Sequence, residues 1–231
     1  MELAQTYAKV GDLAQAEKLA RVALETSEVV EDRVTRAEAW AIGAWVAFGC
    51  GQPRRCREAV DHVDEILRPL EDPADRGFVL QYVARCALSV GARADAAALV
   101  ARLGREVREG ALGDLRPVQA VLEGHTAVLD GRDLVARERL SDAVTLAEAA
   151  QMKPLAIEAH GALGRLLAGT DPGCEHLTRA MELMREITRA IGTEMALTYV
   201  GSVEARQVRA AFEAELLRRS LVDPTDLPGG I

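Results

Sequence analysis

The stretch from Gly77 to Glu109, GFVLQYVARCALSVGARADAAALVARLGREVRE, decides the fold. Its apolar residues recur with the period of an amphipathic helix on both sides of Gly91. Glycine adopts left-handed backbone conformations readily, so a glycine between two helical segments favours a tight turn. The stretch therefore predicts two helices joined by a short turn at Gly91.

The same turn signal recurs along the chain at a fixed interval. Residues spaced by 40 positions stand at the predicted turns, four of them glycines and the fifth an aspartate: Gly11, Gly51, Gly91, Gly131 and Asp171. Self-similarity at a fixed period is typical of repeat proteins, in which each unit is one supersecondary element. The chain is therefore expected to be an array of helix pairs.

Small and apolar residues keep constant distances from these turns. Positions five, nine and twelve after a turn form one stripe of a helix with 3.6 residues per turn. The stripe contains Ala16, Ala20, Ala23, Cys56, Val60, Val63, Ala96, Val100, Leu103, Ala136, Leu140, Ala143, His176, Ala180 and Leu183. Small residues that allow neighbouring helices to approach closely stand seven positions before each turn: Ala4, Ala44, Ala84, Gly124 and Gly164.

Composition and charge limit the classes of function. Hydrophobic residues make up 49% of the 231 residues but aromatic residues only 3%, which suits helices packed closely through small side chains. The net charge of -8 argues against a general nucleic-acid binder. The sequence has no secretory signal and no apolar run long enough for a membrane span, so a cytoplasmic protein is expected. Its four scattered cysteines are expected to be reduced thiols.

The pattern resembles the tetratricopeptide repeat family over roughly residues 1 to 190. The positions that carry the resemblance are Leu3, Ala4, Tyr7, Gly11, Ala16, Ala20 and Ala23, then Trp40, Gly43, Ala44, Leu163 and Gly164. The family's period is about 34 residues. The longer units here are similar to the arrays of bacterial maltose-regulator-type transcriptional regulators and signalling ATPases. HEAT or armadillo repeats, which have a similar period, are the structural alternative.

The resemblance and the repeat together predict an all-α fold. We expect an α-solenoid of about five antiparallel helix pairs in a single domain over residues 1–221, with units at about 1–30, 31–70, 71–110, 111–151 and 152–192. A long helix from Met195 to Leu221 is expected to cap the last unit as residues 193–221, and residues 222–231 to form a disordered tail. In family register Met1 falls inside the first helix, so that helix is short or the chain is a piece of a longer protein.

No motif for chemistry is found in the sequence. It contains no phosphate-binding loop, no nucleophile elbow and no histidine or cysteine cluster with zinc spacing. His160 and His176 can face each other across the helix pair of the fifth unit, and a packed histidine pair is preferred to a metal site that includes Cys174. We therefore expect no enzyme activity, no catalytic residue, no cofactor and no metal.

What the resemblance implies is a binding surface. In the family, the second, fifth, ninth and twelfth positions of each unit line a concave groove. Carried over, the partner-binding residues are Glu38, Trp45, Phe48, Phe78, Gln81, Arg85, His125, Glu158 and Arg165, with Leu88 and Val128 at further twelfth positions. The alternative is that Trp45 and Phe48 pack between units and that Arg85 or Arg165 pairs with a neighbouring glutamate.

Three functions remain open on this evidence. The first is a non-catalytic scaffold that binds a protein or peptide segment in the groove, as the sensing or assembly part of a larger bacterial signalling protein. The second is a small-ligand sensor, which a deep pocket of polar groups around Trp45, Arg85 and His125 would favour over an open groove. The third is a self-associating scaffold, a weak homodimer through Leu3 and Tyr7 of the terminal unit. Neither nucleic acid nor membrane is expected to be a direct partner.

Overall fold

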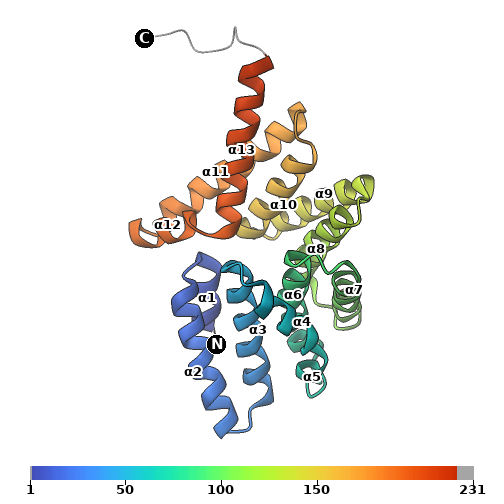
Figure 1. The fold of residues 1–231 in the computed structure, drawn as a ribbon, viewed down its shortest axis with the longest axis vertical. Coiled ribbons are helices and arrows are strands. Elements are labelled where there is room, and N and C mark those ends of the chain that lie inside the picture. The colour runs from blue at the N-terminus through green and yellow to red at the C-terminus, as the bar shows by residue number, and fades with distance from the viewer. Residues whose placement is uncertain (1, 223–231) are drawn as a thin grey trace.

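The computed structural model describes residues 2–222, and 84% of the chain is helical with no strand among the described residues. The prediction of an all-α fold is confirmed. Thirteen α-helices within these residues pack in neighbouring pairs, an arrangement compatible with a helical repeat (Figure 1). Apart from Val222, the tail predicted for residues 222–231 lies outside the described residues.

The helices follow one another with short connections. The first units contain α1 (Glu2–Val10), α2 (Leu13–Val29), α3 (Arg33–Gly49), α4 (Pro53–Asp61) and α5 (Val63–Leu67). The middle units contain α6 (Pro73–Ser89), α7 (Arg93–Glu109), a short 3-10 helix (Gly113–Leu115), α8 (Arg116–Leu129) and α9 (Asp133–Ala149). The last part contains α10 (Lys153–Leu166), α11 (Asp171–Ala190), α12 (Thr193–Val200) and α13 (Val203–Val222). Across residues 2–222, none of the helices combines the length and the apolar character that crossing a bilayer requires.

The turns within the helix pairs have the expected left-handed conformation at glycine. Gly11, Gly51, Gly91 and Gly131 have φ angles of 86°, 62°, 67° and 72°. After each of them, the next backbone N–H donates to a carbonyl five residues earlier, as Ala92 does to Ala87 at 2.9 Å. This hydrogen bond closes the end of the preceding helix in the manner of a Schellman motif.

The fifth turn differs from the prediction. Its left-handed residue is Gly169, with a φ of 84°, whereas Asp171 is already the first residue of α11. Glycine takes the turn because it has no Cβ to clash in this conformation, and Thr170 then caps α11 by accepting a hydrogen bond from the Gly173 N–H. The helix α10 accordingly ends early, at Leu166.

Two predicted helices are each interrupted. The second helix of the second unit divides at His62 into α4 and α5. The capping helix expected from Met195 to Leu221 is wrong as a single helix, because α12 ends at Val200 and α13 starts at Val203. Gly201 and Ser202 form the bend between them, and the Ser202 side chain accepts the Ala205 N–H at 3.3 Å.

The connections between pairs show a second regularity that the sequence analysis did not identify. Glu31, Ala111 and Gln151 have left-handed φ angles of 55°, 52° and 56° although none is a glycine. Their positions differ by 80 and 40 residues, so they keep the period of the glycine turns. Left-handed conformations are strained for residues with a Cβ, so these turns store strain that the adjoining helices hold in place.

Most of the predicted stripe lies in the core, whereas Ala23 and His176 are only partly buried. Ala16, Cys56, Ala96 and Ala136 are almost completely inaccessible to solvent. The small residues before the turns allow close contact, because a Cβ added to Gly164 would lie 2.4 Å from Leu177 Cγ. The same addition to Gly124 would place it 2.6 Å from Leu140.

The first helices of the pairs contact one another in series. α3 packs on α6, and α6 and α10 both contact α8, while the second helices lie outside them (Figure 1). The helix α13 does not extend this order. It returns to pack against α10 and α11, and the bend before it places Ser202 against Gly11 in the first unit. The helix α13, late in the sequence, therefore lies against the inner helix α10, and the bend before it lies against the first turn.

Candidate functional site

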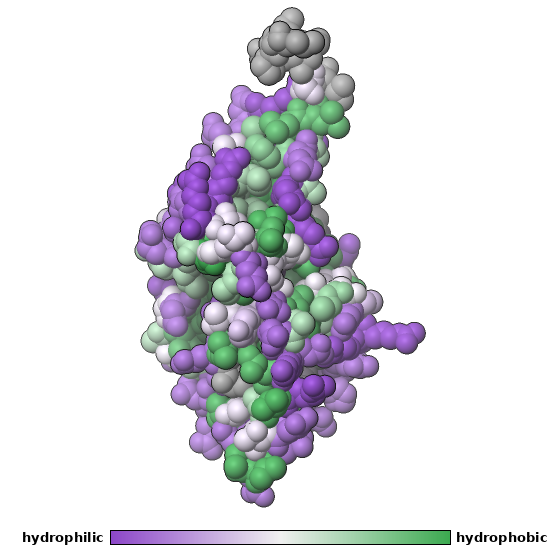
Figure 2. All heavy atoms as spheres, turned by 90° about the vertical axis from the view of Figure 1, so that its left-hand side faces the viewer, coloured by the Kyte–Doolittle hydropathy of each residue, from purple (hydrophilic) through white to green (hydrophobic). Residues whose placement is uncertain are grey.

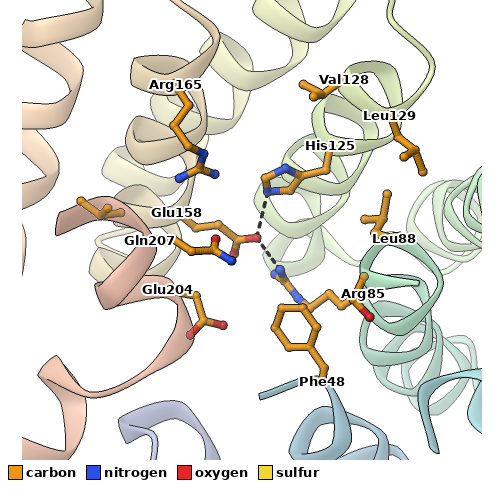
Figure 3. A pocket seen from close by; sticks show the side chains of 12 residues that line it. Phe48, Arg85, Leu88, His125, Val128, Leu129, Glu158, Arg165, Glu204 and Gln207 are labelled. Carbon is orange, nitrogen blue, oxygen red and sulfur yellow. Dashed lines mark hydrogen bonds and ion pairs between the residues drawn. The ribbon is translucent and has the colours of Figure 1, made fainter. Parts of the chain in front are cut away.

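A cavity of about 270 Å³ lies where the inner helices α6, α8 and α10 face α13 (Figure 3). Its polar side chains are Arg85, Ser89, His125, Glu158, Arg165, Glu204 and Gln207. Its apolar side chains are Phe48, Leu88, Val128, Leu129 and Val208. The site thus combines charged groups with an apolar wall in a space slightly below that of typical drug-sized pockets.

Glu158 lies at the centre of the polar groups. One carboxylate oxygen, Oε1, accepts a hydrogen bond from Arg85 Nη1 and lies 3.2 Å from His125 Nε2. Because a carboxylate can only accept, the His125 ring makes this contact with the proton on Nε2. The three residues come from α10, α6 and α8, so the cluster joins three helices across the cavity.

The partners of Glu158 keep it ionised. Burial by itself would raise the pKa of Glu158, but the charge of Arg85 and the hydrogen bonds from His125 and Arg85 lower it to about 2. Burial also acts to lower the pKa of Arg85, and the Glu158 carboxylate outweighs it. A carboxylate held charged by a guanidinium is suited to positioning side chains, and it does not exchange protons near neutral pH.

Trp45 supports Arg85 from behind the cavity. The guanidinium carbon of Arg85 lies 5.3 Å from the centre of the indole ring, a cation–π distance. The indole Nε1 donates to the carbonyl of Ala8 at 3.2 Å, and the ring contacts Tyr82 edge-on at 5.1 Å. Trp45 is on α3 and therefore packs against α1 and α6. This is the alternative role considered for it from the sequence.

Two series of residues with the spacing of the repeat line the cavity. Arg85, His125 and Arg165 differ by 40 positions and lie on α6, α8 and α10. Phe48, Leu88 and Val128 form the second series, on α3, α6 and α8. The equivalent helices thus present the same face, and their side chains converge on one site.

A further wall of the cavity comes from α13. Val208 packs directly on Gly161, where a Cβ would lie 2.6 Å from Val208 Cγ2. Glu204 also faces the cavity, and burial together with the nearby Glu158 raises its pKa. Further along α13 the buried Glu215 accepts the backbone N–H of Gly169 at 3.0 Å, which fixes the helix on the last unit.

The structure brings together five of the nine residues predicted to bind a partner. Phe48, Arg85, His125, Glu158 and Arg165 line the cavity. Four others do not line it, and they are the half-buried Glu38, Trp45, Phe78 and Gln81. Phe78 stacks edge-on with Tyr82 at 5.0 Å, and burial followed by the charge of Asp75 raises the pKa of Glu38.

No protein-family model matches the sequence, and no curated protein matches it.

The histidine pair expected in the fifth unit forms. His160 Nδ1 lies 2.9 Å from His176 Nδ1, and His160 Nε2 lies 3.4 Å from Glu148 Oε1. Among residues 2–222, no group of three or more histidine, cysteine or acidic side chains is arranged to hold a metal ion. The pair connects α10 to α11, and Glu148 connects it to α9.

The residues considered for self-association differ in exposure. Leu3 is 58% exposed, whereas Tyr7 packs against the core formed by α1, α2 and α3. The face shown in Figure 2 carries its apolar side chains in small groups among hydrophilic ones. Small separate apolar groups are ordinary on protein surfaces.

Sequence reasoning missed the contribution of α13. Glu204, Gln207 and Val208 follow the last repeat, and no turn or periodic signal links them to the lining residues of the inner helices. The small size of Gly161 on an inner helix was the available signal that another helix packs there.

Proposed function

We propose that the chain is a non-catalytic binding protein made of tetratricopeptide-like helical repeats, and that it holds a segment of a partner protein at the cavity. The 40-residue period of the glycine turns supports this type of repeat, as does the two-helix composition of most units. In this proposal the inner helices form the concave face of an α-solenoid. The helices α12 and α13 close its C-terminal end.

The observation that carries the proposal is the convergence of repeat-spaced residues. Arg85, His125 and Arg165 occupy equivalent positions in three units, and they meet in one cavity together with Phe48 and Glu158. Arginine and aromatic residues are common anchors of binding sites. Residues selected only for packing within a unit would not need to share one cavity.

A small-ligand sensor is the second candidate, because side chains from five helices, α3, α6, α8, α10 and α13, converge on the cavity. Its volume of about 270 Å³ suits one side chain, a chain terminus or a small molecule. Mass spectrometry of the material released when the purified protein is denatured separates the two candidates. A stoichiometric small molecule would favour the sensor.

Binding to a partner is tested with variants that alter the cavity and keep the fold. Trp45 and Arg85 are unsuitable, because both are part of the packing between helices. Val128 is 43% exposed, so Val128→Trp should narrow the cavity with little effect on the core. Leu134→Asp on α9, where Leu134 is 84% exposed and outside the cavity, is the control.

The measurement is affinity capture of partner proteins from cell lysate by the immobilised full chain, as wild type and as each variant. Circular dichroism verifies that each protein is folded. A partner retained by wild type and Leu134→Asp but lost by Val128→Trp supports the proposal. Equal retention by all three proteins would place the binding surface elsewhere and reject it.

A further inference from the structure

Arg165 is the cavity cation whose charge is not matched by an ion pair. Arg85 pairs with Glu158, but none of the ion pairs found within residues 2–222 includes Arg165. Burial lowers the pKa of Arg165, and the charge of Glu158 opposes this effect. Arg165 is exposed to solvent at the edge of the cavity, so a ligand can reach it. A guanidinium that lines a cavity without a carboxylate partner favours an incoming anion.

The wall opposite Arg165 combines His125 with apolar side chains. Figure 3 shows Arg165 on one side of the cavity and Val128, Leu129 and Leu88 on the other. Val128 is 43% exposed, so this wall has surface left for a ligand to cover. A group that binds here gains free energy by burying apolar surface while its charge stays near Arg165.

The acidic residues of the cavity leave the Arg165 end available. Glu158 is already paired with the Arg85 guanidinium and hydrogen-bonded to His125. Figure 3 shows Glu204 and Arg165 on opposite sides of Glu158. The Gln207 amide, which also lines the cavity, adds a neutral hydrogen-bonding group.

We propose that the cavity binds a carboxylate that carries an apolar group, with the carboxylate on Arg165 and the apolar group against Leu88, Val128 and Leu129. This inference rests on the proposed function and names the chemistry of its ligand. A planar carboxylate matches the paired donors of a guanidinium, and the small volume limits the apolar group to about the size of one side chain. The carboxylate can belong to a chain terminus, an acidic side chain or a free acid.

The test compares acids with uncharged analogues of the same shape. The probes are 4-methylpentanoate and its amide for a free acid, N-acetyl-leucine and its amide for a chain terminus, and N-acetyl-glutamic α-amide for an acidic side chain. Dissociation constants are measured by chemical-shift titration of the ¹⁵N-labelled full chain at low salt. Each acid that fits should bind at least about tenfold more tightly than its amide, because a charged hydrogen bond is lost in the amide. Acetate, which lacks the apolar group, should bind more weakly than 4-methylpentanoate.

The matched variants are Arg165→Gln and Arg105→Gln, which remove the same charge. Arg105 is exposed on α7, away from the cavity. Arg165→Gln should abolish the preference for acid over amide, Arg165→Lys should restore part of it, and Arg105→Gln should retain it. Equal binding of acid and amide, a preference unchanged in Arg165→Gln, or no saturable binding of 4-methylpentanoate or N-acetyl-leucine by wild type would each overturn the inference.

The two proposals fail in different ways. If Val128→Trp loses a captured partner while acids and amides bind alike, the cavity is the binding site and the ligand chemistry is wrong. If acids bind through Arg165 while partner capture is the same in all variants, the carboxylate site stands and the partner-binding function fails.

Discussion

Arg85 and Glu158 form an ion pair between side chains that are 73 positions apart, and it links α6 to α10 past the intervening α8. Only 6% of Arg85 is exposed, and the side chain of Glu158 is 13% exposed. Removing one member of such a pair leaves the other charge desolvated without a partner. Glu158→Gln should therefore destabilise the protein by about 3–5 kcal/mol. Urea unfolding followed by circular dichroism gives this value.

The matched control removes both charges. In Arg85→Met/Glu158→Leu the same space is filled with apolar atoms, so most of the lost stability should return. A cost below about 1 kcal/mol for Glu158→Gln alone would show that water reaches the pair and that the link between the helices is weak.

The histidine pair predicts a loss of stability in mild acid. Burial lowers the pKa of both His160 and His176 in the folded state, and the positive charges of Arg179 and Arg137 act in the same direction while Glu148 and Glu175 oppose it. A histidine with a lowered folded pKa contributes stability that is present above its unfolded pKa of about 6.5 and is lost as the pH falls. The free energy of unfolding should therefore decrease between about pH 7 and 5.

A single substitution tests this assignment. His176→Gln removes one titrating group but keeps a polar side chain beside His160, so the decrease in acid should become smaller. His62→Gln is the control, because His62 is exposed at the junction of α4 and α5. The assignment is wrong if the two variants show the same pH profile as wild type.

Substitution of Gly91 measures the cost of backbone strain without a steric clash. The φ of Gly91 is 67°, and apart from the adjoining residues no atom lies within 4 Å of the position that a Cβ would take. Gly91→Val should therefore cost about 1–2 kcal/mol through the left-handed conformation alone. Thermal and denaturant unfolding measure the change, and the binding of probes at the cavity should be unaffected. A cost no larger than that of an exposed alanine substitution would contradict the role of this turn.

The repeat could be predicted because its signals are local. Glycine at a turn and small residues at helical spacing depend on the conformation of a few neighbouring residues, and these turns and buried stripes are present in the structure. The fifth turn was misplaced because the period pointed to Asp171, whereas the backbone conformation favours Gly169. At this turn the backbone preference of glycine predicts the position better than the 40-residue period does.

The candidate site could be predicted only in part, since it depends on long-range contacts. The family register selected Arg85, His125 and Arg165. It could not show that Arg165 is exposed in the cavity whereas Trp45 packs between helices. The return of α13 onto Gly161 depends on the bend at Gly201 and on the buried Glu215, which have no periodic signal. The wall that turns the groove into a cavity was therefore not predicted.

Replacing alanine with glycine should have opposite effects on stability at Ala111, which is in a left-handed turn, and at Ala101, which is inside a helix. Ala111 has a φ of 52° and is exposed, so Ala111→Gly removes strain without removing a contact. The strain relieved in the folded state should outweigh the conformational entropy that glycine adds to the unfolded chain. The substitution should therefore stabilise the protein by about 0.5–1 kcal/mol. Ala101→Gly, at an exposed position inside α7, should instead destabilise it by about 1 kcal/mol. Urea unfolding of both variants measures the difference, and destabilisation of equal size at the two sites would show that the turn stores no strain.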